Sequence, residues 1–127
     1  MKLEDQVVSL ELAKRLKELG VKQESYFQWF DEGSFGSVVD RRESGNGPYG
    51  QERYAAFTVA ELGELIFGSV IDGNKPNLGF RTFRDYKGKN VFGWDRHIDF
   101  SSDTEADARA KMLIYLLENK LCSPTSL

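Results

Sequence analysis

One histidine and its acidic neighbours are the first residues whose types and spacing could support catalysis. His97 is the only histidine in the chain, and Asp95 and Asp99 flank it in the pattern D-x-H-x-D. On a strand these side chains share one face, where a carboxylate can orient the imidazole as a base or the three can bind a divalent ion. However, no motif ties a serine or cysteine nucleophile to His97, and no phosphate-binding loop, H-E-x-x-H or C-x-x-C motif is present. We therefore expect a surface histidine, with no catalytic residue, no cofactor and no metal ion.

Residues 80–89, FRTFRDYKGK, mix basic and aromatic side chains in a pattern suited to nucleic acid. Rings stack on bases and cations pair with phosphates, as on surfaces that bind single strands. The residues that would make these contacts are Arg81, Arg84, Tyr86, Lys87 and Lys89. Against this interpretation, the chain has a formal net charge of −3 and a pI near 5.2, and hairpin aromatics commonly belong to a core. Binding of single-stranded nucleic acid through this hairpin is therefore the alternative function.

A protein partner is the first hypothesis. Aromatic residues make up 13% of the chain, and three of them, Tyr26, Trp29 and Phe30, crowd one short stretch. Tyrosine and tryptophan are enriched at protein interfaces. With no catalytic motif and an acidic composition, the sequence predicts a small non-enzymatic interaction module, with these three aromatics as its interaction residues.

Residues 12–30, LAKRLKELGVKQESYFQWF, contain the ingredients of a DNA-binding helix-turn-helix but not its spacing. Gly20 follows Ala13 by seven residues instead of about four, and the dense aromatics after it favour a strand. We predict a helix over 10–19 that is capped by Ser9 and closes at Gly20, followed by an extended segment over 25–30. No second helix would then be offered to a DNA groove.

Length and composition indicate one domain spanning residues 1–127. The chain is 40% hydrophobic, has no apolar run long enough to cross a membrane, and begins without the apolar segment of a signal peptide. Its single cysteine, Cys122, excludes an internal disulfide and fits a reducing compartment. These features predict a cytoplasmic protein.

Two further helices carry local start signals. Thr58 and Glu61 stand at capping-box spacing before a helix expected over 59–67, which Gly68 would end. Ser102 and Glu105 stand at the same spacing before a helix expected over 103–121. Gly63 inside the first of these helices suggests close approach to another element. The predicted core includes Leu16, Leu62, Trp94, Leu113 and Leu117.

The remaining segments read as strands and loops. Strands are expected at 25–30 and 35–41, and in a second hairpin whose later strand runs through 91–98. The stretch 41–53 has three glycines and one proline and predicts a mobile surface loop, and residues 122–127 predict a frayed tail. The predicted fold is α+β, with a small antiparallel sheet of about four strands and three helices in the order α-β-β-α-β-β-α.

Three stretches together resemble a known family. SLELAKRLKELGVKQESYFQW, AFTVAELGELI and EADARAKMLIYLLEN are similar to segments of small uncharacterised proteins of tailed phages, prophages and bacterial mobile elements. The resemblance covers about half of the chain. It implies a cytoplasmic protein derived from a mobile element, with a host or phage protein as its expected partner, and it transfers no activity and no site residue.

Overall fold

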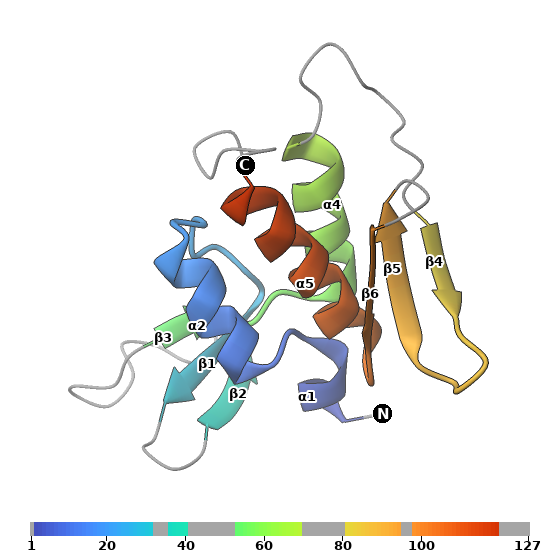
Figure 1. Cartoon of the computed structure of the whole chain (residues 1–127). Coiled ribbons are helices and arrows are strands. Elements are labelled where there is room, and N and C mark those ends of the chain that lie inside the picture. The colour runs from blue at the N-terminus through green and yellow to red at the C-terminus, as the bar shows by residue number, and fades with distance from the viewer. Residues whose placement is uncertain (1, 32–35, 41–52, 70–80, 95–97, 120–127) are drawn as a thin grey trace.

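A computed structural model of the chain describes residues 2–31, 36–40, 53–69, 81–94 and 98–119 (Figure 1). The mobile loop predicted over 41–53 and the tail over 122–127 lie almost entirely outside these ranges, as do Asp95 and His97. Statements below concern the described residues.

The first two helices are α1 (Leu3–Gln6) and α2 (Leu10–Glu18). The Ser9 hydroxyl accepts a hydrogen bond from the backbone N–H of Leu12, which confirms the predicted cap. Gly20 has a φ of 89°, and Val21 N–H donates to the carbonyl of Leu16, so the helix closes where the sequence predicts. The described residues 21–31 contain no helix and lead directly into an extended strand, so the expectation of a strand in place of a second DNA-reading helix is confirmed.

The first sheet has the strand order β2-β1-β3 and is antiparallel. Its strands are β1 (Phe27–Asp31), β2 (Gly36–Asp40) and β3 (Arg53–Ala55). Pairing of β1 with β2 confirms the first predicted hairpin. Strand β3 was not predicted, because its three residues follow the glycine-rich stretch and give no periodic signal of their own.

Helix α4 (Val59–Ser69) begins at the predicted capping box. Glu61 accepts the Thr58 backbone N–H at 3.0 Å, and the Thr58 hydroxyl accepts the Glu61 backbone N–H at 3.2 Å. The helix continues through Gly68, so the predicted end at residue 67 is wrong by two residues. A glycine ends a helix only when it leaves the helical conformation, and Gly68 does not leave it.

The second sheet has the order β4-β5-β6 and is also antiparallel. Its strands are β4 (Arg81–Arg84), β5 (Asn90–Trp94) and β6 (Ile98–Ser102). The single strand predicted through residues 91–98 is wrong, because the chain reverses after Trp94 and Ile98 pairs back with it. A reversal of this kind depends on pairing between strands, which the alternation of residues within one strand does not reveal.

Helix α5 (Glu105–Glu118) is capped by Thr104, whose hydroxyl accepts the Asp107 backbone N–H at 3.2 Å. The predicted capping box of Ser102 and Glu105 is wrong, since Ser102 belongs to β6 and pairs there with Asn90. The two candidate caps, Ser102 and Thr104, lie two residues apart. Ser102 is the last residue of β6, so Thr104 caps the helix.

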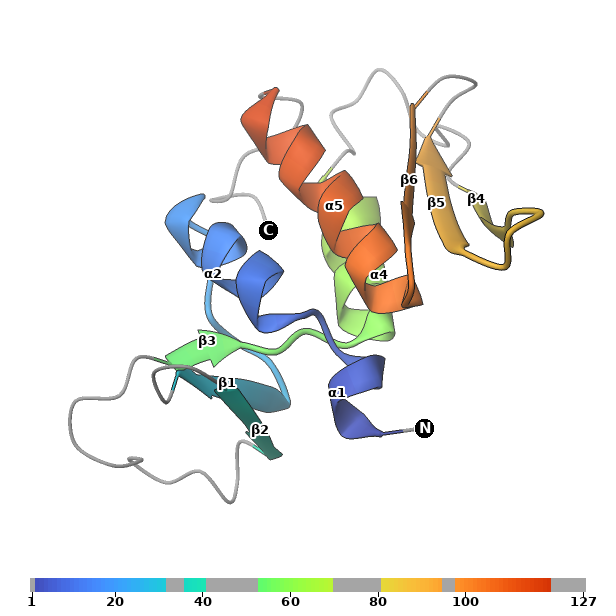
Figure 2. The same ribbon diagram turned by 60° about the horizontal axis from the view of Figure 1, so that its bottom comes forward.

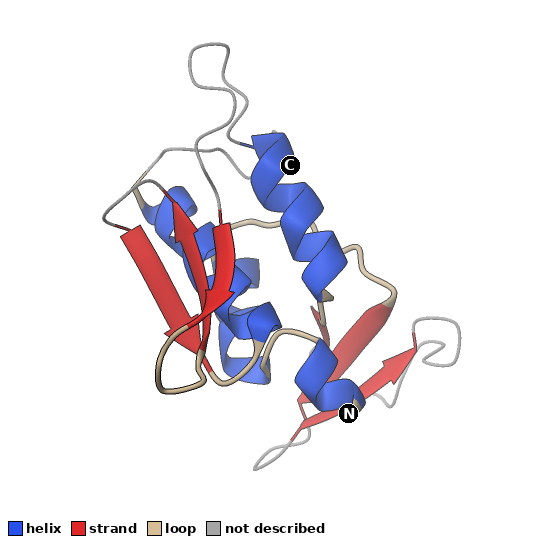
Figure 3. Cartoon of the chain, turned by 90° about the vertical axis from the view of Figure 1, so that its right-hand side faces the viewer, coloured by secondary structure: helices blue, strands red, loops and turns tan. Residues whose placement is uncertain are grey.

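The helices lie between the two sheets (Figures 1 and 2). Helix α2 packs on β1 and β3, whereas α5 packs on β5 and β6 and also contacts α2 and α4. Figure 3 shows the sheets on separate sides of the helices. The α+β class and antiparallel pairing are confirmed, but the described strands form two sheets of three instead of one sheet of about four. The additional elements are α1, β3 and β6.

The core fills the space between these layers. Leu16, Leu62 and Leu113 are fully buried and Leu117 is nearly so, as predicted, while the side chain of Trp94 lies outside the described set. Phe92 of β5 joins them and continues the core onto the second sheet. None of the helices in the described ranges has both the length and the apolar character needed to cross a bilayer.

Candidate functional site

The predicted interaction aromatics separate into one exposed and two buried residues. Tyr26 is 74% exposed, but Trp29 and Phe30 are only 7% and 5% exposed. The indole N–H of Trp29 donates to the carbonyl of Val8 at 2.7 Å. The Arg53 guanidinium lies 5.3 Å from the centre of the Phe30 ring. The prediction that Trp29 and Phe30 form an interaction surface is therefore wrong, because both side chains serve packing.

Strand β1 explains why this prediction failed. Trp29 and Phe30 are successive residues, so their side chains point to opposite faces of the sheet, and both are nevertheless buried. A strand paired on both edges and covered on both faces carries a continuous apolar run. The dense aromatics of residues 26–30 signalled such a central strand.

The basic hairpin, in contrast, is exposed along its whole first strand. All four residues of β4, Arg81–Arg84, are exposed, and Phe83 keeps 40% of its surface accessible. Tyr86 at the turn is 92% exposed. We define the hairpin surface as Arg81, Phe83, Arg84, Tyr86 and Lys87.

The turn that presents this surface is held by one carboxylate. Asp85 accepts the backbone N–H groups of Lys87 at 2.8 Å and Lys89 at 2.9 Å, and its own N–H donates to the Lys89 carbonyl. Gly88 takes a φ of 81°, which a side chain would disfavour. Aspartate is common in turns because its short side chain reaches the backbone a few residues ahead. The turn therefore holds Tyr86 and Lys87 outward on an ordered frame.

Two of the four hairpin cations are neutralised by neighbouring carboxylates. Arg81 forms an ion pair with Asp99 at 3.1 Å, and Lys89 forms one with Asp103. The hydrogen bond to Asp103 raises the pKa of Lys89, and the same bond lowers the pKa of Asp103. Both groups in that pair stay charged at neutral pH.

Arg84 and Lys87 keep an uncompensated charge. Neither forms an ion pair with another residue in the described ranges, and Lys87 extends over the Tyr86 ring with its Nζ 5.6 Å from the ring centre. The sequence identified Arg84 and Lys87 as candidate ligand contacts. The carboxylates that pair with Arg81 and Lys89, in contrast, follow only from the pairing of the strands. The positive charge available to a ligand is thus smaller than four basic residues suggest.

Gly93 makes the Arg81–Asp99 pair possible. The three residues stand side by side across the sheet, and a Cβ on Gly93 would lie 2.1 Å from Asp99 Oδ1 and 3.2 Å from Arg81 Nε. A glycine inside a strand commonly marks such close approach, so Gly93 is the signal in the sequence for this ion pair.

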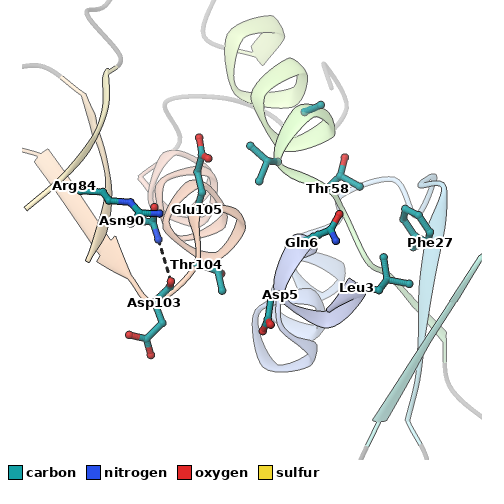
Figure 4. Close-up of a pocket in the computed structure, with 12 residues that line it drawn as sticks. Leu3, Asp5, Gln6, Phe27, Thr58, Arg84, Asn90, Asp103, Thr104 and Glu105 are labelled. Carbon is teal, nitrogen blue, oxygen red and sulfur yellow. Dashed lines mark hydrogen bonds between the residues drawn. The ribbon is translucent and has the colours of Figure 1, made fainter. Parts of the chain in front are cut away.

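A cavity of about 570 Å³ opens beside Arg84. Figure 4 shows Leu3, Phe27 and Thr58 on one side of it and Arg84 and Asn90 on the other. It therefore lies where α1 and the start of α4 face the turn end of the β4–β5 hairpin. The Asn90 side-chain amide donates to the Asp103 carbonyl at 3.0 Å, which fixes this edge of the cavity.

Two of the three carboxylates that line the cavity, Asp103 and Glu105 but not Asp5, are engaged in ion pairs within the described residues. Asp103 is paired with Lys89, and Glu105 is paired with Arg109 at 3.1 Å. A general acid at neutral pH needs a pKa near 7, whereas Lys89 lowers the pKa of Asp103. These contacts favour a structural role for both carboxylates.

The predicted histidine site lies partly outside the described residues. Asp99 is described and engages Arg81, whereas the positions of Asp95 and His97 are not. In the ranges that the structure covers, no group of three histidine, cysteine or acidic side chains is placed to hold a metal ion.

Comparison with known proteins gives no match: no family model, no curated protein and no solved structure corresponds to this chain. The resemblance to phage and mobile-element proteins therefore stays a prediction.

Proposed function

We propose that this protein is a non-enzymatic interaction module that binds another protein through the hairpin surface. The observation that supports this most directly is the exposure of all four residues of β4 together with the exposed ring of Tyr86. Tyrosine and arginine are the residue types most enriched among energetically dominant interface contacts. The proposal retains the protein partner predicted from the sequence, but it assigns the binding surface of this chain to β4 and its turn instead of to β1.

The order of the hairpin supports a binding role. Side chains held by a fixed backbone lose less conformational entropy when a partner orders them, and Asp85 fixes the turn through two backbone hydrogen bonds. The Arg81–Asp99 pair likewise restrains the far end of the strand. A host or phage protein as partner and a cytoplasmic location are both part of the proposal, and the single cysteine of the chain supports the location.

Affinity capture from the cell that makes the protein tests this proposal. The bait would be compared with a triple variant, Phe83→Ser, Tyr86→Ser and Lys87→Glu, which changes only exposed hairpin side chains. Tyr26→Ser is the matched control, because Tyr26 is an exposed aromatic on a different element. We expect mass spectrometry to find one partner with the native protein and the control, and not with the triple variant. Retention of the partner by the triple variant would contradict the proposal. Loss of the partner with Tyr26→Ser would show that the binding surface includes residue 26.

Single-stranded nucleic acid is the second candidate ligand. The exposed alternation of Arg81, Phe83, Arg84 and Tyr86 favours it, since rings and cations are both accessible. The carboxylates that pair with Arg81 and Lys89 count against it, because they reduce the charge available to phosphates. A salt titration with an oligothymidine separates the two candidates: phosphate binding weakens steeply with salt through counterion release.

A further inference from the structure

The outer edge of β4 offers main-chain hydrogen-bonding groups as well as side chains. Among the described strands only β5 pairs with β4, so no described strand lies beside the opposite edge of β4. All four residues of β4 are exposed. Figure 1 shows β4 as the outermost strand of its sheet.

The register identifies which residues point their backbone groups outward. The Asp85 N–H donates to the Lys89 carbonyl, so Asp85 and Lys89 face each other as a hydrogen-bonded pair at the end of the ladder. Such pairs alternate with non-hydrogen-bonded pairs along an antiparallel ladder. Phe83 and Arg81 therefore direct their N–H and C=O groups toward β5, whereas Thr82 and Arg84 direct theirs toward the open edge.

We propose that an extended acidic peptide segment of the partner adds to β4 as a further antiparallel strand. This inference rests on the proposed function and names its mode of binding. Hydrogen bonds to the outward N–H and C=O groups of Thr82 and Arg84 would supply the pairing, as in other cases of strand addition to a sheet edge. Phe83 and Tyr86 would cover the apolar side chains of the added strand.

Charge complementarity identifies the occupant as acidic. Arg84 has no ion-pair partner within the described ranges, its backbone groups face the open edge, and its side chain lies at the rim of the cavity in Figure 4. A residue placed opposite it on an added strand would lie within reach of the guanidinium, where an opposite charge stabilises and a like charge destabilises. Lys87 at the turn adds a second uncompensated cation at the same end of the strand.

The same charges disfavour a second copy of this chain at the edge. If two β4 strands paired with their outward-facing Arg84 backbones opposite each other, the guanidinium of one copy would lie beside that of the other. Like charges directly opposite each other across a ladder oppose pairing. The uncompensated charge of Arg84 thus disfavours this self-association and favours an acidic partner.

The direct test uses a fluorescent peptide of alternating glutamate and valine with the full-length protein. Fluorescence anisotropy should show saturable binding below about 1 mM, and tenfold or weaker binding of a lysine–valine peptide. N-methylation of the central peptide amides removes the main-chain donors but keeps every side chain. This change should lower the affinity by about tenfold or more, and it requires no change in the protein.

A substitution in the protein tests the same hydrogen bonds from the other side. Thr82→Pro removes an N–H that faces the open edge, a position where proline is tolerated in edge strands. Thr82→Val keeps the N–H and the branched side chain and is the matched control. We expect Thr82→Pro to weaken peptide binding by about tenfold while Thr82→Val leaves it unchanged, with equal circular dichroism spectra for all three proteins.

Each contrary outcome has a separate meaning. Equal binding of the N-methylated peptide, or no saturable binding of the acidic peptide, would overturn strand addition. If the triple hairpin variant still loses its cellular partner in that case, the proposed function stands and only its mode is wrong. Tighter binding of an oligothymidine than of the acidic peptide would overturn the inference in favour of nucleic acid, and concentration-dependent dimerisation lost in Thr82→Pro would overturn it in favour of a second copy.

Discussion

The guanidinium of Arg109 joins three elements and explains a glycine in the middle of a helix. It donates to the Val59 carbonyl of α4 at 3.2 Å and to Glu105 of its own helix, and it lies over the Phe92 ring of β5. A Cβ on Gly63 would lie 2.4 Å from Arg109 Nη1. The close approach that the sequence suggested for Gly63 is therefore a contact with a half-buried arginine.

Replacing Gly63 by alanine should destabilise the protein although alanine is the better helix former. Helix propensity would contribute about 1 kcal/mol, but displacing Arg109 from Val59 loses a charged hydrogen bond of about 1.5–3 kcal/mol. Urea unfolding should show a net loss of about 1 kcal/mol. The control is the same change in an Arg109→Ala background, where Gly63→Ala should stabilise. Stabilisation in both backgrounds would mean that Arg109 does not occupy this position.

Asp107 should make stability fall as pH rises above about 4. Burial raises the pKa of its carboxyl, and the 2.7 Å hydrogen bond from the Ser9 N–H offsets this only in part. Because the folded-state pKa exceeds the unfolded value of 3.8, the folded state holds the proton to higher pH and loses stability as that proton leaves. Asp107→Asn should therefore gain stability relative to the native protein as pH rises from about 4 toward neutral.

Denaturant unfolding at a series of pH values measures this dependence. Asp103→Asn is the control with the opposite sign, because Lys89 lowers the pKa of Asp103. The stability of the native protein should increase relative to that of Asp103→Asn as pH rises. A carboxyl whose pKa is lowered in the folded state contributes stability that is lost on acidification. Parallel pH profiles for the two variants would refute the assigned directions.

At the scale of elements, Glu61 fastens the start of α4 to the segment before β1. One oxygen accepts the Thr58 N–H and lies 2.9 Å from the Ser25 hydroxyl, and the other accepts the Tyr26 N–H at 3.3 Å. Ser25 is itself buried. A helix cap thus also closes a contact between segments more than 30 residues apart in sequence.

Glu61→Ala should cost more than the loss of an ordinary cap. Capping changes cost about 0.5–2 kcal/mol, and the loss of the charged acceptor of the Ser25 hydroxyl, which keeps only the Ala56 carbonyl at 3.1 Å, adds about 1 kcal/mol. We expect a total of about 2–3 kcal/mol in urea unfolding. Glu64→Ala in the same helix is the control, because Glu64 is exposed and should change stability by less than about 0.5 kcal/mol. Equal effects at both positions would show that the contacts of Glu61 contribute nothing.

Elements defined by local chemistry were the ones that the sequence predicted. Ser9 with Gly20, and Thr58 with Glu61, act within a few residues, so their spacing suffices to place α2 and the start of α4. The choice of Thr104 over Ser102 as a cap depends on a strand pairing with Asn90, which spacing does not reveal. For the same reason the division into two sheets was missed.

The candidate site was predictable in its side chains and not in its backbone. The composition of residues 80–89 identified the exposed cations and rings. Their partners Asp99 and Asp103 lie on or just after β6, a strand that the sequence merged with β5. The open edge of β4 also follows only from the strand order.

At the scale of the whole molecule, α5 connects the parts. It contacts α1, α2 and α4 and packs on β5 and β6, so the side chains of its buried face link the two sheets through the helices. Leu113 is fully buried on that face. Removing its side chain should therefore weaken both halves of the protein together.

Leu113→Ala should lower the free energy of unfolding by about 2–5 kcal/mol, the range for a buried leucine. In a Trp94→Phe background, where Trp29 is the remaining tryptophan, circular dichroism and tryptophan fluorescence should follow one transition in the variant, since Trp29 reports on the first sheet while α5 packs on the second. Ile114→Ala is the control, because Ile114 is only partly buried and should cost less. Two separate transitions would show that α5 does not couple the halves.

The central position of α5 has a consequence for synthesis on the ribosome. Helix α4 is complete at Ser69, but its partner α5 ends only at Glu118. At about 5–20 residues per second, the apolar faces of α2 and α4 wait on the order of several seconds for the helix that covers them. During that interval the nascent chain exposes Leu62 and Ile66, which are fully buried afterwards, and is open to chaperones and proteases. We therefore expect folding of this chain to be completed only after α5, its last described helix, has been synthesised.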